Sequence, residues 1–176
     1  MFTIRKATSD DCKLINELAN QVFPATYKEI LSTEQLDYMM EWMYSPENLR
    51  RQMAEGHVYY IAYKDGTPCG YLSVQPEAED LYILQKIYIL PRFQGVHAGS
   101  FLFRKAIEHI KQLHPAPCRM ELHVNRHNKA VQFYERMGMR KLREGDFEIG
   151  GGFYMNDYIM AVSYTHLRAH ETRRHL

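Results

Sequence analysis

The sequence predicts one mixed α+β domain, in which helices flank a central sheet of seven strands. Three observations support this class. The chain has 176 residues, which is the usual size of one domain with a sizeable core. Segments with the two-residue period of strands alternate with segments of helical period. A nearly continuous apolar run, LYILQKIYIL at residues 81–90, is typical of a strand covered on both faces.

The N-terminal part of the chain is predicted to be one strand followed by helices. Ser9 or Asp10 fits the N-cap of the first helix, because a short polar side chain can bond the free N–H groups there. Ser45 and Pro46 fit the cap and first turn of a later helix. The predicted strand covers 2–7, and the helical patterns cover 9–23, 32–44 and 45–55.

The rest of the chain is predicted to be strands separated by two helices. Asp65 and Gly66 form a strong signal for a hairpin turn between the first two of these strands. The strands are expected at 57–63, 68–75, 81–90, 118–124, 139–145 and 153–162, and the helices at 100–113 and 129–137. We write the predicted order as β-α-α-β-β-β-α-β-α-β-β.

Composition excludes several classes of protein. The formal net charge is +1 and the charges are scattered, so we expect no binding to nucleic acid or to a membrane surface. No apolar run has the length of a membrane span, and the N-terminus lacks the apolar core of a signal peptide. The three cysteines are widely spaced. These features predict a soluble protein of the cytoplasm.

The last residues, 163–176, change character abruptly. They carry three histidines and three arginines without a periodic apolar stripe. We therefore place the domain at residues 1–162 and expect 163–176 to be a non-native or disordered tail. The alternative is a basic tail that binds an anionic partner.

The segment RFQGVHAGS at residues 92–100 joins the apolar strand to a helix. Unpaired N–H groups and the helix dipole meet at such a junction, so an anion is expected to bind there. The segment lacks the Gly-Lys-Ser/Thr of a Walker loop and the Gly-x-Gly-x-x-Gly of a dinucleotide site. Taken alone, it could equally be an ordinary connection.

A second segment makes the interpretation more specific. Residues 87–102, IYILPRFQGVHAGSFL, and residues 121–139, ELHVNRHNKAVQFYERMGM, closely resemble the paired motifs of the GCN5-related N-acetyltransferases (GNAT) in order and spacing. The resemblance extends over residues 2 to about 162. It implies the GNAT fold, with a strongly twisted mixed sheet whose fourth and fifth strands part to admit the pantetheine of acetyl-CoA. Acetyl-CoA is then the cosubstrate, and no metal is required.

The resemblance also implies site residues. The loop would hold the pyrophosphate of acetyl-CoA, the strand before it and Asn128 would border the pantetheine, and Tyr134 would lie beside the thioester sulfur. The implied cofactor-binding residues are Ile87, Ile89, Gln94, Gly95, Val96, His97, Ala98, Gly99, Ser100 and Asn128.

His97 stands where the family usually has a glycine. Main-chain N–H groups carry most of the affinity for phosphate, so His97 need not abolish binding. We predict an ordinary negative φ at His97 with the side chain turned outward, because a left-handed residue there would penalise histidine. A direct contact between the imidazole and a CoA phosphate is the alternative. At Gly99 we expect a larger side chain to enter the space of the phosphates and to strain any positive φ.

The reaction needs a neutral amine, whereas an alkylamine with a pKa near 10.4 is mostly protonated at pH 7. Several family members use a glutamate on the central strand as base, and Gln85 stands at that position. By alternation Gln85 shares a face with Ile87 and Ile89, so it is predicted to orient a water, with Glu77, Glu121 or a further water completing the relay.

Tyr134 is predicted to be the acid that protonates the departing thiolate, because a phenol can donate a proton to sulfur. The alternative is a packing role on a helical stripe. His123 and His127 are spaced as zinc ligands on a helix would be, but a strand-to-turn context argues against zinc.

The acceptor is less defined. Residues 21–39 and 152–160 are similar to the bacterial spermidine/spermine acetyltransferase branch, which implies an acceptor site beside the early helices. Candidate substrate-binding residues are Phe23, Tyr27, Tyr38 and Glu41, although a solvated helix face would also explain Glu41. We expect acetyl transfer to a primary amine of a small molecule such as a polyamine. The alternatives are a protein N-terminus or an antibiotic amine as acceptor, or a catalytically weak acyl-CoA sensor. A homodimer is left open.

Overall fold

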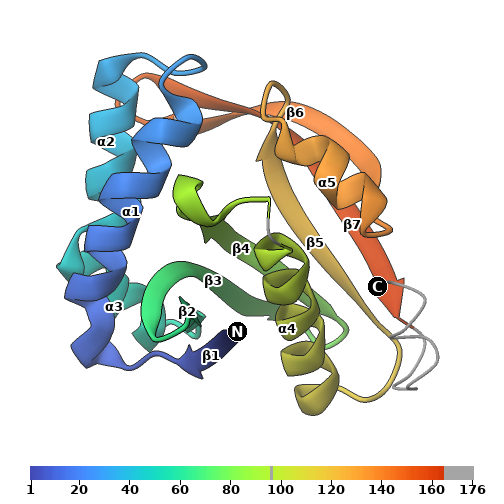
Figure 1. The fold of residues 1–176 in the computed structure, drawn as a ribbon. Helices are drawn as coiled ribbons and strands as arrows, with labels where there is room; N and C mark the ends of the chain where they lie inside the picture. Colours follow the sequence, from blue (N-terminus) through green and yellow to red (C-terminus); the bar gives the residue numbers. More distant parts are fainter. Residues whose placement is uncertain (96, 165–176) are drawn as a thin grey trace.

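The computed structural model describes residues 1–95 and 97–164. These residues form one seven-stranded sheet with helices on both faces (Figure 1). The strands are β1 (Phe2–Lys6), β2 (Val58–Lys64), β3 (Thr67–Ala78), β4 (Leu81–Ile89), β5 (Cys118–Asn125), β6 (Arg140–Gly150) and β7 (Phe153–Tyr164). The helices are α1 (Cys12–Tyr27), α2 (Thr33–Tyr44), α3 (Pro46–Ala54), α4 (Ala98–Leu113) and α5 (Ala130–Arg136), with short 3-10 helices at Ser9–Asp11 and Pro91–Phe93.

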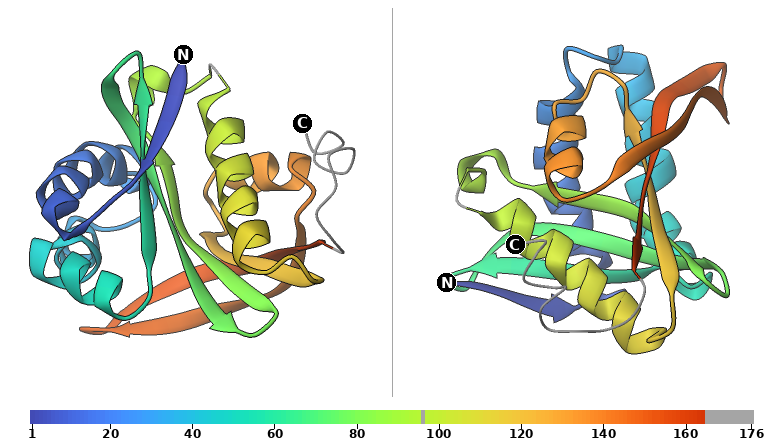
Figure 2. Two further views of the ribbon diagram at one scale, coloured as in Figure 1. Left: turned by 90° about the horizontal axis from the view of Figure 1, so that it is seen from below. Right: turned by 90° about the vertical axis from the view of Figure 1, so that its right-hand side faces the viewer.

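The strand order in the sheet is β1-β2-β3-β4-β5-β7-β6. All neighbours are antiparallel except β4 and β5, which run parallel. Figure 2 shows α1, α2 and α3 on one face of the sheet and α4 and α5 on the other. The predicted mixed fold with seven strands is therefore confirmed.

The order of elements differs from the prediction in one respect. Three helices separate the first two strands, as the three helical patterns at 9–23, 32–44 and 45–55 predicted, whereas the written order gave only two. Ser45 ends α2 and also caps α3, because its hydroxyl accepts from the Asn48 N–H at 3.2 Å and Pro46 follows it. The first helical segment is capped by Thr8 rather than by Ser9 or Asp10, in a capping box with Asp11.

The strands β4 and β5 separate over most of their length. They pair only over Leu81–Ile83 and Arg119–Glu121. Beyond this point they part, and α4 begins at the opening (Figure 1). One edge of β4 is thereby left without a strand partner, so its backbone groups are available to a ligand. The predicted parting of the fourth and fifth strands is confirmed.

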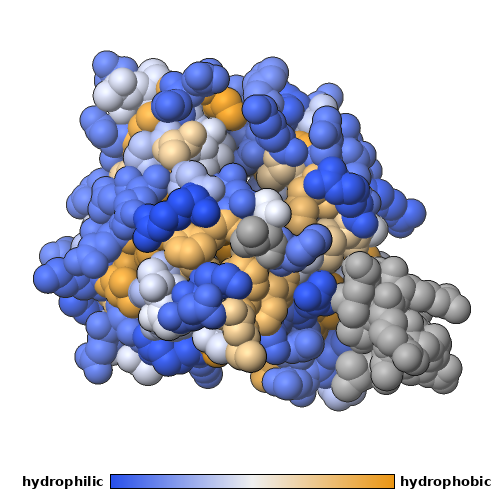
Figure 3. Space-filling model, in the orientation of Figure 1, coloured by the Kyte–Doolittle hydropathy of each residue, from blue (hydrophilic) through white to orange (hydrophobic). Residues whose placement is uncertain are grey.

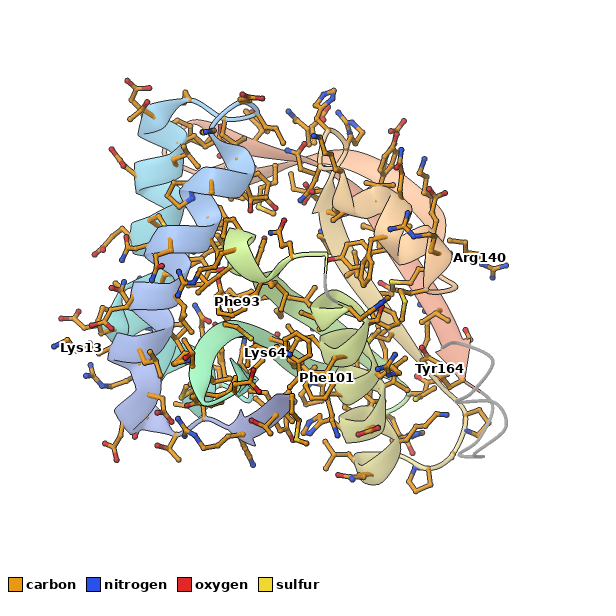
Figure 4. The ribbon with its side chains drawn as sticks, viewed as in Figure 1. Lys13, Lys64, Phe93, Phe101, Arg140 and Tyr164 are labelled. Carbon is orange, nitrogen blue, oxygen red and sulfur yellow. The ribbon has the colours of Figure 1, made fainter. Side chains whose placement is uncertain are left out.

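The core consists of two clusters, one on each face of the sheet. One cluster lies under α4 and α5 and includes Leu102, Phe103 and Met120. The other lies under the first three helices and includes Ile15 and Leu49. Phe93, labelled in Figure 4, packs against both clusters at the turn after β4. This turn positions the loop that leads into α4.

The last strand extends two residues past the predicted domain boundary. Ser163 and Tyr164 belong to β7, where Tyr164 pairs with Cys118 and its side chain is buried (labelled in Figure 4). Of the predicted tail, residues 165–176 lie outside the described part of the chain. A search of the described residues for a helix of membrane-spanning length and hydropathy found none.

Candidate active site

A cavity of about 790 Å³ occupies the place where β4 and β5 part. The end of α1, β4, the loop after it, the start of α4, β5 and α5 all contribute to its wall. Figure 3 shows apolar side chains gathered in the middle of this face, bordered by polar ones. The predicted residues in the wall are Tyr27, Gln85, Ile87, Ile89, Gln94, Gly95, His97, Ala98, Gly99, Ser100, Asn128 and Tyr134. Val96 lies outside the described residues.

The first residues of α4 form part of the cavity wall. The first helical hydrogen bond runs from the Phe101 N–H to the His97 carbonyl at 3.1 Å. The N–H groups of Ala98, Gly99 and Ser100 precede it and lack helical acceptors, as at any helix start. The helix N-cap is His97, whose side chain makes no capping bond among the described residues. These N–H groups and the helix dipole favour an anion.

The predicted conformation of His97 is wrong. Its φ is +65° and ψ is +15°, in the left-handed region, although the side chain is exposed as expected. Gly95 also has a positive φ, of +84°. The chain needs a left-handed residue here to turn into α4, and histidine adopts that conformation at a cost of about 1–2 kcal/mol. This explains why a glycine would suit the position.

Gly99 has a different role from the predicted one. It lies inside α4, and its φ is not positive. A Cβ added there would lie 3.3 Å from the ring of Phe133, so the missing side chain lets α4 approach α5 closely. Gly99 is therefore constrained by helix packing at the cavity wall and not by backbone strain.

The cavity wall carries an excess of positive charge. Its lysine and arginine residues are Lys28, Lys86, Lys129 and Arg136, and its one carboxylate among the described residues is Glu29. The whole chain has a net charge of only +1. Positive charge is therefore concentrated at the cavity wall, where it complements a polyanionic ligand.

A hydroxyl and amide network lies where the strands part. The Tyr27 hydroxyl is 3.0 Å from the Tyr88 hydroxyl and accepts from Asn128 Nδ2 at 3.2 Å. The Asn128 Oδ1 accepts from the Ala130 N–H at 2.8 Å and so fixes the start of α5. Tyr134 is buried nearby, and burial raises its pKa well above the usual value, with Tyr27 adding to the effect. Tyr134 therefore holds its proton at neutral pH.

Gln85 does not share a face with Ile87 and Ile89. The register of β3 and β4 shifts between Ser73 and Val74, and Gln85 is the extra residue of a β-bulge. The bulge breaks the alternation on which the prediction depended. The Gln85 amide donates to the Gln75 side chain at 2.9 Å.

Lys86 follows the bulge and was missed by the sequence analysis. Its Nζ donates to Gln52 Oε1 at 2.7 Å and to the Tyr59 hydroxyl, and it lies 4.7 Å from the Tyr44 ring centroid. Burial lowers the pKa of Lys86 from 10.5 to about 7. A single lysine within an apolar strand was the available signal.

Of the predicted acceptor residues, only Tyr27 lines the cavity. Phe23 is buried in the core with its ring 4.6 Å from that of Tyr27. Tyr38 lies on α2, and its hydroxyl donates to the Ile149 carbonyl at 2.9 Å. Tyr38 and Glu41 are therefore not part of the cavity wall, and Tyr38 ties the β6–β7 hairpin to α2.

The two carboxylates predicted for a proton relay and the two histidines considered as zinc ligands lie in different places. Glu121 is buried, and its carboxylate pairs with Arg119 at 2.6 Å. Glu77 is exposed and is not part of the cavity wall. His123 lies on β5, whereas His127 lies in the turn after it. No group of three or more metal-binding side chains was found among residues 1–95 and 97–164.

Comparison with known proteins identifies the family. Residues 16–139 match the acetyltransferase (GNAT) family. The chain belongs to this family. Membership confirms the predicted enzyme class, an N-acetyltransferase that takes its acetyl group from acetyl-CoA.

Individual GNAT proteins are similar over most of the chain. A spermidine N(1)-acetyltransferase of Thermoplasma acidophilum is 23% identical over 78% of this chain and 87% of its own length. The PaiA N-acetyltransferase of the same organism, solved with coenzyme A, has a TM-score of 0.76 and 25% identity, covering 93% of this chain and 99% of its own. The ribosomal-protein-S18-alanine N-acetyltransferase of Escherichia coli has a TM-score of 0.71 at 15% identity, covering 96% and 97%. The last similarity establishes the fold alone.

Proposed function

We propose that this GNAT protein transfers the acetyl group of acetyl-CoA to a primary amine of a small molecule, with polyamines as the acceptor class. The observation that carries the proposal is the single cavity at the parted strands. Its wall includes both the helix start that suits a diphosphate and the end of α1 on the other face of the sheet. Two substrates can therefore meet in it from opposite sides.

The residues present fit acetyl-CoA as a substrate. The phosphates would lie at the N–H groups of Ala98, Gly99 and Ser100, with Lys129 and Arg136 supplying positive charge. The pantetheine amides would pair with the free edge of β4 near Ile87 and Ile89, and Asn128 would border the same arm. Because these contacts use backbone groups, the His97 side chain is not required.

Tyr134 is proposed as the general acid. The amine nitrogen attacks the thioester carbonyl carbon, and the C–S bond breaks as the amide forms. The departing thiolate then needs a proton, which the Tyr134 hydroxyl would supply and recover from the amide nitrogen or from solvent. A buried phenol that stays protonated suits this role.

The polyamine proposal is supported by the name of the Thermoplasma relative, which is only 23% identical. We propose to test it by following CoA release from acetyl-CoA with spermidine, spermine, putrescine, an alanyl peptide and an aminoglycoside. Preference for the polyamines by tenfold or more in kcat/KM is the expected result. Preference for the peptide or the aminoglycoside would refute the acceptor class. Tight acetyl-CoA binding without CoA release would favour a sensor module instead.

A further inference from the structure

Polar side chains line the face of β5 and β7 that points away from α4. On β5, Glu121, His123 and Asn125 alternate with core residues of the other face. On β7, Asp157 pairs in register with Asn125. His123 is the member of this group that also lines the cavity.

Asp157 is buried in an unusual way. Only 2% of it is exposed, and its Oδ2 has no hydrogen-bond partner among the described residues. The His123 imidazole lies beside this oxygen, with Nδ1 at 3.8 Å from Oδ2. A buried carboxylate oxygen without a partner destabilises the fold, so its position needs another explanation.

We propose that His123, supported by Asp157, is the proton acceptor for the amine in the acetyl transfer, in place of the base that Gln85 cannot supply. This inference rests on the proposed function. At 3.8 Å the contact is electrostatic and not a hydrogen bond. Because Nδ1 faces the carboxylate, Nε2 is the nitrogen left to accept a proton from an amine in the cavity. Asp157 is then a positioning residue that stabilises the imidazolium, and His123 is the group that touches the substrate.

In the proposed reaction, an ammonium acceptor loses two protons when it becomes an amide. His123 Nε2 takes the first, which frees the nitrogen lone pair for attack, and later releases that proton to solvent. Tyr134 passes its proton to the CoA sulfur as the C–S bond breaks, and the second proton of the nitrogen returns to Tyr134, directly or through solvent. No further reactant is needed.

Charged groups on the neighbouring elements set the pH range of the pair. Burial raises the pKa of Asp157 to about 6, and Arg126 opposes this rise. Burial lowers the pKa of His123, with Arg143 adding to the effect and Glu121 opposing it. Tyr27 faces Asp157 from α1. Above about pH 6 Asp157 is therefore ionised while His123 is neutral, which is the state that a base requires.

The test compares His123→Ala, Asp157→Asn and the wild type over pH 6 to 9.5, with spermidine and acetyl-CoA. His114→Ala is the matched control, because His114 lies at the far end of α4 and its Nδ1 contacts the Ala116 carbonyl. At pH 7 we expect kcat/KM to fall about a hundredfold in His123→Ala and about tenfold in Asp157→Asn. The control should stay within twofold of the wild type.

The pH profile separates catalysis from structure. The neutral fraction of an amine with a pKa near 10.4 rises more than a hundredfold from pH 7 to 9.5. The deficit of His123→Ala should therefore shrink at least tenfold over this range, and an alkoxyamine, which is already neutral at pH 7, should restore most of its rate. A deficit that is the same at every pH and with both acceptors would overturn the proposal.

Two further measurements do not depend on turnover. Asp157→Asn removes a buried charge, so at pH 8 it should melt several degrees above the wild type, whereas loss of a merely structural carboxylate would lower the melting temperature. In NMR titrations, the apparent pKa of His123 should fall by at least 0.5 in Asp157→Asn, because an opposite charge is lost. An unchanged His123 pKa would refute the pair, whereas absence of turnover with every amine would refute the proposed function.

Discussion

Replacing His97 by glycine tests how the cofactor loop is built. His97 has φ +65° and ψ +15°, and its exposed side chain makes no capping bond among the described residues. A left-handed conformation costs a residue with a Cβ about 1–2 kcal/mol. Glycine removes this cost but gives the unfolded chain more freedom, worth roughly 0.5–1 kcal/mol. We therefore expect His97→Gly to stabilise the protein by about 0–1 kcal/mol.

His97→Ala is the matched variant, because both substitutions remove the imidazole and only alanine keeps the strain. Glycine should be more stable than alanine by about 1 kcal/mol, which is about 2–4 °C in melting temperature for a chain of this size. Differential scanning calorimetry measures this directly. If alanine were as stable as glycine, the left-handed conformation would not constrain the loop.

Binding of acetyl-CoA gives the second readout for the same variants. If main-chain N–H groups hold the phosphates, the dissociation constants of His97→Gly and His97→Ala should stay within about tenfold of the wild type, or ~1.4 kcal/mol. Calorimetric titrations at pH 6 and pH 8 complete the test. Tighter binding of the wild type at pH 6, lost in both variants, would show that the imidazole contacts a phosphate and would refute the backbone explanation.

Three further predictions concern Tyr134, the proposed general acid, together with the buried lysine and the last strand. Tyr134→Phe keeps the ring, so acetyl-CoA affinity should persist while kcat falls roughly ten- to a thousandfold, and an unchanged kcat would exclude the acid role. Lys86 has a folded pKa of about 7 against 10.5, so its burial costs about 5 kcal/mol below pH 7, and this cost disappears as the pH rises toward 10.5. Lys86→Met removes that cost together with two hydrogen bonds worth roughly 0.5–1.5 kcal/mol each, while the Tyr59 hydroxyl still donates to Gln52 Oε1. Chemical denaturation should therefore find the variant more stable than the wild type at pH 6 and less stable at pH 10, and a difference independent of pH would contradict the buried charge. A chain ending at Val162 loses the buried Tyr164 ring, so its free energy of unfolding should fall by about 3 kcal/mol. A chain ending at Tyr164 keeps the ring and should melt within about 2 °C of the full chain. Equal stability of the two truncated chains would show that Tyr164 contributes nothing.

Local patterns in the sequence were sufficient for most of the fold. The hairpin turn at Asp65 and Gly66 and the cap at Ser45 depend on neighbours in the chain, and both were predicted and found. The connection between β4 and α4 was also predicted and found, because a strand, a glycine-containing loop and a helix follow one another directly. The three helical patterns predicted before the second strand were also found as three helices, so only the written order of elements, which gave two, was one helix short.

The sequence pattern did not predict two departures from regular backbone geometry. Alternation places Gln85 with Ile87, but one extra residue in β4 reverses the faces that follow it. His97 was expected to avoid positive φ on steric grounds, yet the path of the chain into α4 imposes it. In both cases a tertiary constraint is stronger than a local preference of about 1 kcal/mol.

The sequence by itself determined the family, the order of the strands along the chain and the position of the loop before α4, since each depends on residues that are close together in the chain. Only the tertiary structure decided the order of the strands in the sheet and which distant groups come together. Asp157 reaches His123 because β7 lies beside β5 in the sheet, and Tyr27 reaches Asn128 across 101 residues because α1 ends where α5 begins. Burial then sets the charge of these groups, and burial is a property of the packed chain that no local pattern contains.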